Sequence, residues 1–118
     1  MITTKQRDGA AAEDLAAAFL VRHGLAIVGR NYRCRGGEID LVARDGTTLV
    51  FVEVRYRRSR QFGGASASVD ARKQARILVA ARHYLAQRGE VPCRCDVVAL
   101  DALEPGRIEW VKDAFGAE

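Results

Sequence analysis

The sequence has few cysteines: three, Cys34, Cys93 and Cys95, among 118 residues. An odd number of cysteines in a chain of this kind argues against a framework of disulfide bonds. Cys93 and Cys95 resemble half of a zinc site, but such a site commonly needs four Cys or His ligands. The two histidines, His23 and His83, are not near the cysteines in sequence. We therefore expect the cysteines to be small, partly buried residues without a metal.

Long apolar runs are also absent. A helix that crosses a bilayer needs about 20 consecutive apolar residues, and no segment of this chain approaches that length. Residues 1–8 lack the apolar core of a signal peptide. These absences predict a cytoplasmic protein that has no membrane partner.

The composition is typical of one globular domain. Hydrophobic residues make up 48% and charged residues 29% of the chain, a balance that supports a buried core. We expect a single domain over residues 1–118, with its core over about 9–112. The 19 Lys and Arg residues exceed the 15 Asp and Glu residues, which gives a net charge of +4. This modest excess is compatible with an anionic partner.

The predicted elements follow the order helix, three strands, helix, two strands. The first helix is expected over 9–23, ended by Gly24, and the second over 69–88, capped by Ser68. The strands are expected over 25–32, 37–42, 49–55, 95–100 and 107–111. The first three strands form an antiparallel meander, and the second helix is long enough to cross over to a parallel neighbour. The predicted fold class is therefore α/β, with a small mixed sheet flanked by helices.

The third strand is apolar on both faces, which is typical of a strand in the middle of a covered sheet. Because strand side chains alternate, one set should face one layer and the other set the opposite layer. The two sets are Val50, Val52 and Val54 on one face, and Leu49 and Phe51 on the other. Polar residues that follow in this strand are intrusions at the end of a buried segment, and strand ends are common ligand sites.

Acidic residues interrupt two strands that an Asp-Gly turn at 45–46 joins into a hairpin. Glu38 and Asp40 share one face of their strand, and Glu53 and Arg55 share one face of the next. If the hairpin register aligns these faces, three carboxylates and one guanidinium converge. Like charges repel at short range, so such a cluster needs a metal ion or a proton among its members.

Two of these carboxylates, Asp40 and Glu53, are arranged as the ligands of Mg²⁺ or Mn²⁺ are in enzymes that act on phosphodiesters. Arg55 lies two residues after Glu53 on the same side, where it would neutralise a phosphate. The alternative is a surface ion-pair network, with Glu53 paired to Arg55 or Asp40 to Arg57. Both interpretations remain open, because the carboxylates interrupt runs that otherwise look buried.

Glu13 lies on the flank of the apolar stripe of the first helix. By itself it is a solvated glutamate near a helix N-terminus, where the helix dipole favours negative charge. If this flank packs against the open end of the strands, Glu13 becomes a third metal ligand or a group that positions water.

Cations cluster between the third strand and the second helix. The candidates to bind a nucleic acid are Arg57, Arg58, Arg60, Arg72, Lys73, Gln74 and Arg76. Such a surface would bind the backbone and deliver one phosphate to an adjacent acidic pocket. The alternative is a solvated rim that offsets the nearby carboxylates.

Five segments of the chain carry a resemblance to a known family. They are Gly9-x-x-Ala12-Glu13, Arg30-Asn31-Tyr32-Arg33-Cys34-Arg35, Gly37-Glu38-Ile39-Asp40-Leu41-Val42, Val50-Phe51-Val52-Glu53-Val54-Arg55 and Lys73-Gln74. Together they resemble the YraN-like family of small uncharacterised bacterial proteins over about residues 9–100. That family is similar in turn to the restriction-endonuclease-like fold, which includes archaeal Holliday-junction resolvases.

The resemblance implies catalytic roles for Glu13, Asp40, Glu53 and Arg55. In enzymes of that fold two strand carboxylates hold Mg²⁺, the helix glutamate assists, and a lysine positions or activates the attacking water. Arg55 stands at the lysine position here. An arginine stabilises phosphate charge but does not readily lose a proton, so it is a poor general base. Lys73 is another residue that could supply the cation.

Three functions follow as hypotheses. The first is a Mg²⁺-dependent or Mn²⁺-dependent endonuclease that hydrolyses DNA, with branched or structured DNA as a candidate substrate. The second is a nucleic-acid-binding module of the same fold with weak or no catalysis, favoured by the arginine at position 55. The third is a subunit whose acidic patch docks a basic protein. A homodimer would match the two-fold symmetry of a DNA junction.

Overall fold

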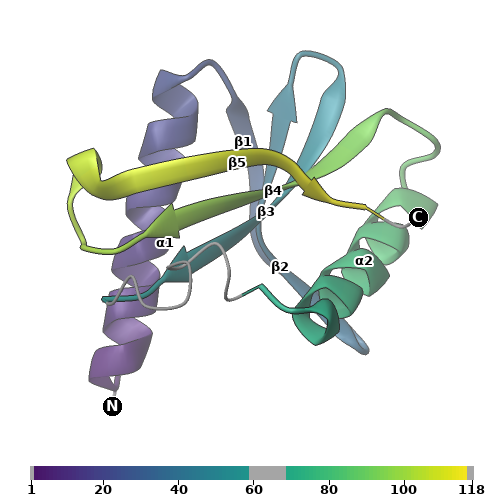
Figure 1. Ribbon diagram of the computed structural model, residues 1–118. Helices are drawn as coiled ribbons and strands as arrows, with labels where there is room; N and C mark the ends of the chain where they lie inside the picture. Colours follow the sequence, from purple (N-terminus) through teal and green to yellow (C-terminus); the bar gives the residue numbers. More distant parts are fainter. Residues whose placement is uncertain (1, 59–68, 117–118) are drawn as a thin grey trace.

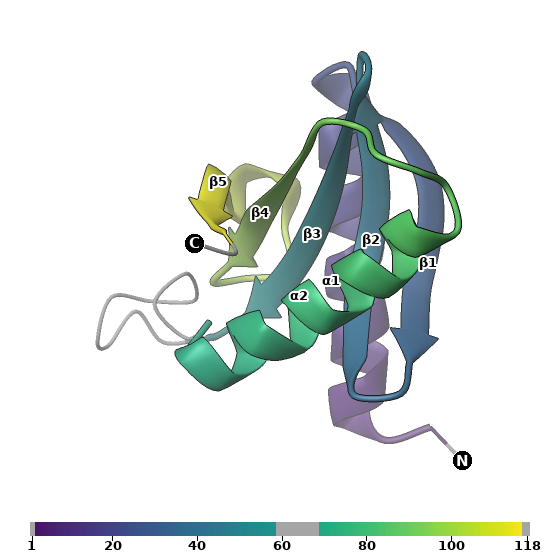
Figure 2. The same ribbon diagram turned by 90° about the vertical axis from the view of Figure 1, so that its right-hand side faces the viewer.

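The computed structural model of the protein describes residues 2–58 and 69–116. Its elements are α1 (Thr4–Arg22), β1 (Ala26–Cys34), β2 (Gly37–Asp45), β3 (Thr48–Tyr56), α2 (Ala71–Ala86), β4 (Cys93–Leu100), the 3-10 helix η3 (Pro105–Arg107) and β5 (Ile108–Phe115). The sheet separates α1 from α2 (Figures 1 and 2). The predicted α/β class and order of elements are confirmed, and the arrangement is consistent with a small α/β nuclease-like fold.

The five strands lie in the order β1-β2-β3-β4-β5. The first three are antiparallel neighbours, β4 runs parallel to β3, and β5 is antiparallel to β4. A parallel pair needs a crossover connection, and α2 lies in that connection between β3 and β4. The predicted meander and crossover are therefore confirmed.

Two apolar layers cover the two faces of the sheet. On the α2 side the core includes Phe51, with Leu49 packed against it, and on the α1 side it includes Val50 and Val52, with Val54 packed against them. These are the two sets of side chains that the alternation in β3 predicts. Because β3 is buried on both faces, a charged side chain at its end lies against the core.

The first helix begins earlier than predicted, at Thr4 instead of residue 9. Thr3 caps it: its side chain accepts a hydrogen bond from the backbone of Gln6, and the Gln6 side chain accepts one from the backbone of Thr3. This capping box satisfies donors that a helix start leaves unpaired, so it outweighs Gly9 as a start signal. Neither helix in the described part of the chain combines the length and apolar character needed to cross a membrane.

The second helix begins later than predicted. Its cap is Asp70, whose side chain accepts a hydrogen bond from the Lys73 backbone, and Val69 lies before the helix as part of the core. Ser68, the predicted cap, lies outside the described residues. Asp and Ser are comparable caps, so propensity could not separate these starts.

The predicted strands are correct in number but short. The observed strands extend past the predicted bounds in β1 to Cys34, in β2 to Asp45, in β3 to Tyr56, in β4 back to Cys93 and in β5 to Phe115. Polar residues at strand ends carry no alternation signal, although their backbones still pair. Strand ends are therefore harder to predict than strand centres.

The three cysteine thiols are free. Cys34 is half-buried and Cys95 is buried, but Cys93 is exposed, so the expectation of burial is wrong for Cys93. Burial, aided by the nearby Cys93, raises the pKa of the Cys95 thiol to about 12. A thiol that holds its proton so firmly is a packing group, not a nucleophile.

Candidate active site

Glu53 lies near the end of β3 and is 2% exposed. Burial raises the pKa of its carboxyl group to about 8, and the charge of Asp40 and a hydrogen bond with Asp40 act in the same direction, against the attraction of Lys73 and Arg55. No group in the described part of the chain donates a hydrogen bond to its buried Oε1 atom. A buried carboxylate oxygen without a donor is costly, so this atom needs either a proton or a cation.

Asp40 lies beside Glu53 because the β2–β3 ladder stops there. The last paired residues are Leu41 and Val52, and the Asp40 carboxylate then takes over by accepting a hydrogen bond of 2.8 Å from the backbone nitrogen of Val54. Beyond the last backbone pair, the Asp40 side chain thus accepts the next hydrogen bond from β3 in place of a β2 backbone carbonyl. One oxygen of Asp40, Oδ2, is fixed by this bond, and the carboxylate is held close enough to perturb the pKa of Glu53.

Two cations contact the other oxygen of Glu53. Arg55 Nη1 lies 3.4 Å from Glu53 Oε2, and Lys73 Nζ lies 3.7 Å from the same atom. Lys73 Nζ also donates a hydrogen bond of 3.2 Å to Glu38 Oε1, and this bond is the main cause of a lowered Glu38 pKa. The predicted convergence of three carboxylates and Arg55 is therefore observed, with Lys73 placed between Glu38 and Glu53.

Glu13 reaches the same place from α1. Its side chain is half-buried, and burial followed by the charge of Asp40 raises its pKa. A hydrogen bond from the Asn31 side chain and the charge of Arg30 act in the opposite direction. The flank of α1 does pack against the open end of the strands, which is the condition under which Glu13 joins the site.

Asn31 is a contributor that sequence reasoning missed. Its φ is +52°, a left-handed conformation that costs most residues energy and that Asn tolerates better than most. The β1–β2 register on either side places it opposite Asp40. An Asn before an aromatic residue in a strand is a weak signal by itself, so only the backbone conformation reveals its role.

We expect Asn31→Gly to raise the pKa of Glu13 further. Glycine accepts the left-handed backbone, while the hydrogen bond that favours the ionised carboxylate disappears. A carbon-detected NMR titration of the Glu13 side-chain carboxyl would measure the change. Asp113→Gly is the matched control, because Asp113 has a φ of +51° on β5, away from the site. An identical Glu13 titration in Asn31→Gly and wild type would contradict this role.

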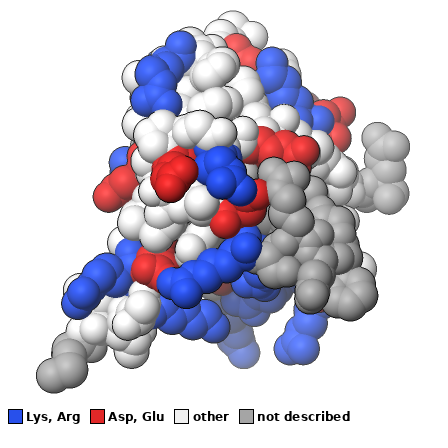
Figure 3. All heavy atoms as spheres, turned by 60° about the vertical axis from the view of Figure 1, so that its left-hand side comes forward, with Lys and Arg blue, Asp and Glu red and all other residues white. Residues whose placement is uncertain are grey.

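Of these side chains, Glu13, Asp40, Glu53, Arg55 and Lys73 line one cleft of about 440 Å³. Its lining residues are Thr4, Lys5, Asp8, Gly9, Ala12, Glu13, Asp40, Glu53, Val54, Arg55, Tyr56, Arg57 and Lys73. The first turns of α1, which the sequence prediction left out, therefore form one wall. Figure 3 shows Lys and Arg side chains gathered with acidic ones on the lower part of the face that it presents. The cleft combines an acidic floor with a cationic border.

Comparison with known proteins assigns the chain to a family. Residues 12–100 match the "Uncharacterised protein family UPF0102". This chain belongs to the UPF0102 family. A UPF0102 protein of Cupriavidus taiwanensis is 60% identical over 118 residues, covering 98% of this chain and 87% of the relative. One of Methylobacillus flagellatus is 49% identical over 106 residues, covering 90% and 94%, and one of Nitrosomonas europaea is 52% identical over 108 residues, covering 91% and 92%.

The family assignment confirms the resemblance to the YraN-like proteins. The UPF0102 match begins on α1 just before Glu13 and ends with β4. It therefore contains Glu13, Asp40 and Glu53, and also Lys73 on α2, whereas Asp8 of the cleft lining lies outside it. The strand β5, which pairs only with β4 in the described sheet, lies outside the matched segment.

Within this UPF0102 fold the predicted nucleic-acid-binding residues have different surroundings. Arg57 is exposed and lines the cleft, whereas Arg58 pairs with Asp8 at 3.5 Å. Gln74 is half-buried, and its side-chain amide donates a hydrogen bond to the Val69 carbonyl just before α2. This donor therefore stabilises the start of the helix. Arg72 and Arg76 are exposed on α2, Lys73 lies in the cleft, and Arg60 lies outside the described residues.

The donor set of the site suits a hard divalent cation. Its carboxylate oxygens are the ligands that Mg²⁺ and Mn²⁺ prefer, and Mg²⁺ usually takes only one or two of them. In residues 2–58 and 69–116 no group of three or more Cys, His, Asp or Glu side chains is placed to hold a metal. Asp40 and Glu53 form a two-carboxylate set, and the unsatisfied Oε1 atom of Glu53 provides a free ligand atom.

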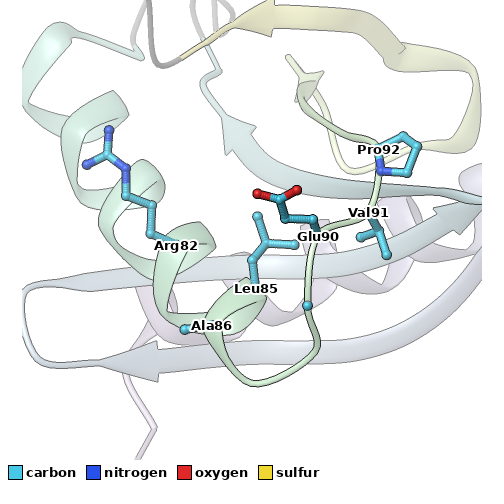
Figure 4. Close-up of a pocket in the computed structure, with 7 residues that line it drawn as sticks. Arg82, Leu85, Ala86, Glu90, Val91 and Pro92 are labelled. Atoms are coloured by element: carbon cyan, nitrogen blue, oxygen red, sulfur yellow. The ribbon is translucent and has the colours of Figure 1, made fainter.

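A larger hollow of about 740 Å³ lies elsewhere, between the end of α2 and the segment that leads into β4 (Figure 4). Most of its lining is apolar, from Leu85 and Ala86 on the helix and Val91 and Pro92 on the segment. It contains one Glu and one Arg but no cluster of carboxylates among the described residues. The smaller acidic cleft is therefore the candidate active site of this UPF0102 protein.

Proposed function

We propose that this protein is a Mg²⁺-dependent or Mn²⁺-dependent endonuclease that hydrolyses phosphodiester bonds of DNA, with branched or structured DNA as the candidate substrate. The proposal includes a cytoplasmic location, which the free thiols of the three cysteines support. A homodimer is part of the proposal only for a two-fold symmetric junction substrate.

One observation carries this proposal: the buried Oε1 atom of Glu53 has no hydrogen-bond donor in the described part of the chain, in a cleft shared with Asp40 and Glu13. The ion pairs of Glu53 with Arg55 and Lys73 both involve Oε2, so they leave Oε1 without a partner. A buried Asp on the neighbouring strand β4 shows the contrast, because Asp96 accepts hydrogen bonds from three separate groups. Glu53 is therefore arranged to hold either a proton or a cation at this position, and a divalent cation would take the place of the proton.

In the proposed phosphodiester hydrolysis, each residue of the site has a separate role. Asp40 and Glu53 would hold the metal, and when bound it supplies Lewis-acid stabilisation of phosphate charge and lowers the pKa of water. Arg55, half-buried beside Glu53, can donate to the phosphate as its charge develops. Glu13, with its raised pKa, can orient water or take its proton.

Lys73 is a second candidate, beside Arg55, for the cation that a lysine supplies in the motif. Arg55 does not readily give up a proton, but Lys73 Nζ lies 3.7 Å from Glu53 and borders the cleft from α2. A second cation is therefore available where the motif has only one. Lys73 therefore supports the nuclease proposal as a second cation at the cleft, and the arginine at position 55 supports the alternative of a binding module with weak or no cleavage.

The experiment is Mg²⁺-dependent cleavage of supercoiled plasmid, single-stranded DNA and a four-way junction. We expect Asp40→Asn and Glu53→Gln each to lower the cleavage rate at least about 100-fold, because each removes a charged ligand atom. Glu109→Gln is the matched control, since Glu109 is an exposed carboxylate on β5. Its rate should equal that of the wild type.

Three outcomes separate the competing functions. Cleavage that survives both substitutions belongs to a contaminant, and the nuclease proposal then fails. Binding of DNA without cleavage by the wild type favours the binding module, and a gain of cleavage in Arg55→Lys would show that the cleft is intact but limited by its cation. A basic protein as partner is disfavoured by the structure, because Glu53 is buried and Glu38 is engaged by Lys73.

A further inference from the structure

A cationic ridge runs beside the cleft, where α2 meets the β1–β2 turn. The ridge consists of Arg72 and Arg76 on α2 and Arg35 in the turn, and all three side chains are exposed. Arg72 and Arg76 are four residues apart, so they lie on one side of the helix. The ridge was only partly visible in the sequence, because Arg35 belongs to a different element.

The β1–β2 turn packs closely against α2, and this contact sets the position of the turn relative to the ridge arginines of the helix. A Cβ on Gly37 would lie 2.3 Å from the carbonyl oxygen of Arg76, and one on Gly36 would lie 3.7 Å from Val79 Cγ1. Glycine backbone therefore touches α2 directly at the level of Arg76. Arg35 immediately precedes these glycines, so its backbone lies where the turn meets the helix, on the same side of the molecule as Arg76.

The charges of the ridge are not neutralised by the described part of the protein. Neither the helix arginines nor Arg35 has a carboxylate within ion-pair distance in the stretches 2–58 and 69–116, whereas Arg33 and Arg58 each have one and Lys73 has two. Arg76 acts on Glu38 only through longer-range attraction. Like charges held on one fixed surface repel one another, and an anion that bridges them removes this cost.

We infer that the ridge of Arg35, Arg72 and Arg76 binds the phosphate backbone of a nucleic acid and leads it from the cleft across α2 to the β1–β2 turn. The inference deepens the proposed function and rests on it for the direction of the strand. Lys73 connects the ridge to the cleft, because it lines the cleft and directly follows Arg72 in sequence. Arginine is suited to this task because its planar fork binds phosphate through two parallel hydrogen bonds.

The occupant is a nucleic acid because the ridge is continuous with a cleft that fits a phosphodiester. A backbone that enters the cleft carries further phosphates on both sides, and one side must pass over α2 or over the first turns of α1. On the α1 side Arg58 is paired with Asp8, and Lys5, which lines the cleft, has no ion pair among residues 2–58 and 69–116. The side over α2 offers three cations without an ion pair in the same residues, Arg35, Arg72 and Arg76, so it offers the larger set of phosphate contacts beyond the cleft.

The test is fluorescence anisotropy of labelled duplex, single-stranded and junction DNA over a series of salt concentrations, in EDTA so that nothing is cleaved. We expect the variant with Arg35→Gln, Arg72→Gln and Arg76→Gln to raise Kd at least about tenfold at about 0.1 M salt. The slope of log K against log salt should become shallower by about 2 to 3, because up to three phosphate contacts are lost.

The matched control replaces three exposed arginines outside the ridge, Arg22, Arg44 and Arg82, with Gln. It removes the same net charge but none of the proposed phosphate contacts, so it should change the slope by less than about one. Each single ridge substitution should change the slope by about one, which keeps the inference testable if the triple variant unfolds. Equal losses in the ridge and control variants would reduce the ridge to a general charge effect and overturn the inference.

The outcomes for the ridge and for the nuclease are separable. If the wild type cleaves DNA but the ridge variant binds as tightly as the wild type, the ridge assignment fails and the nuclease stands. If the ridge variant loses binding while the wild type never cleaves, the ridge stands and the binding module replaces the nuclease. If the wild type binds no nucleic acid in EDTA, the ridge assignment fails, and an acidic protein becomes the partner to test.

Discussion

Glu53→Gln should make the protein more stable than the wild type above pH 8, by up to about 5 kcal/mol in the free energy of unfolding. The physical reason is the raised pKa of Glu53, about 8 in the folded protein against 4.5 for an unperturbed glutamate. A difference of one in pKa corresponds to about 1.4 kcal/mol, so the whole difference corresponds to about 5 kcal/mol as an upper bound. Urea unfolding at a series of pH values measures the gain in stability.

The sign follows from which state binds the proton. Above pH 4.5 the unfolded chain has released the proton of Glu53, while the folded protein keeps it until about pH 8. Across this window the folded state binds more protons, so the stability of the wild type falls as the pH rises. The amide of the Glu53→Gln variant cannot ionise, which removes this slope. The two proteins should therefore have similar stability near pH 4.5 and diverge towards pH 8.

Glu38→Gln is the control with the opposite sign. The hydrogen bond from Lys73 lowers the pKa of Glu38, so its contribution to stability is present above the unfolded pKa and is lost as the pH falls. Removing this carboxylate should lower stability at neutral pH and have little effect in acid. If Glu53→Gln behaves like Glu38→Gln, the buried carboxylate is satisfied in the folded protein, and the argument for a ligand at Oε1 is lost.

Divalent cations provide an independent readout of the same site. A cation bound between Asp40 and Glu53 favours the ionised carboxylate, so Mg²⁺ or Mn²⁺ should raise the stability of the wild type most at pH 8 and above. Binding to the folded state at about 100 times Kd adds about 2.7 kcal/mol. Glu53→Gln should lose most of this gain, while Glu109→Gln should retain it.

The sheet was predictable because its signals are periodic. The alternation of Val50 and Val52 with Phe51 placed β3 between two layers, and the Asp-Gly turn fixed its partner. The helix starts were less predictable, because Thr3 and Asp70 act through side-chain hydrogen bonds that any of several polar residues could supply. The period of apolar residues shows which face of an element is buried. A helix start depends instead on one side-chain hydrogen bond, which any of several neighbouring polar residues could make.

The candidate site was predictable only in part. An acidic residue in an apolar strand can be either a buried group that the protein satisfies with hydrogen bonds or a group that binds a ligand. Asp96 interrupts β4 as Glu53 interrupts β3, and both are buried. Asp96 is satisfied by Arg94, by Trp110 and by the backbone of Asp113, two of which lie on a strand that joins only in three dimensions. The strand pattern alone does not separate the two acids. The structure shows which one has an oxygen without a donor in the described part of the chain.

Gly37→Ala should destabilise the protein by about 3 kcal/mol or more, and it is the single methyl group with the largest expected effect. A Cβ at this position would lie 2.3 Å from the carbonyl oxygen of Arg76 and 2.8 Å from the backbone nitrogen of Ala80. Both atoms belong to the backbone of α2, so no side chain can move aside to make room. Overpacking of a well-packed core usually costs about 1 to 3 kcal/mol, and backbone clashes lie at or beyond the upper end.

Two glycines in the same protein serve as controls for the loss of glycine itself. Nothing lies within 4 Å of a Cβ at Gly106, and a Cβ at Gly29 would meet Val42 Cβ at 3.9 Å, an ordinary contact. Neither has a positive φ, so alanine should be tolerated at both positions. Thermal unfolding of the three variants gives the comparison. A Gly37→Ala variant as stable as Gly106→Ala would mean that α2 is not in backbone contact with β2.

The same substitution also tests how the fold positions the candidate active site and the proposed ridge. To accommodate the methyl group, α2 must move away from the β1–β2 turn, and it carries Lys73 and the two ridge arginines with it. A Gly37→Ala protein that still folds should therefore bind DNA with a shallower salt dependence, and its Glu38 pKa should rise towards the ordinary value because the Lys73 hydrogen bond lengthens. The close contact at this glycine would then position the cations as well as stabilise the core.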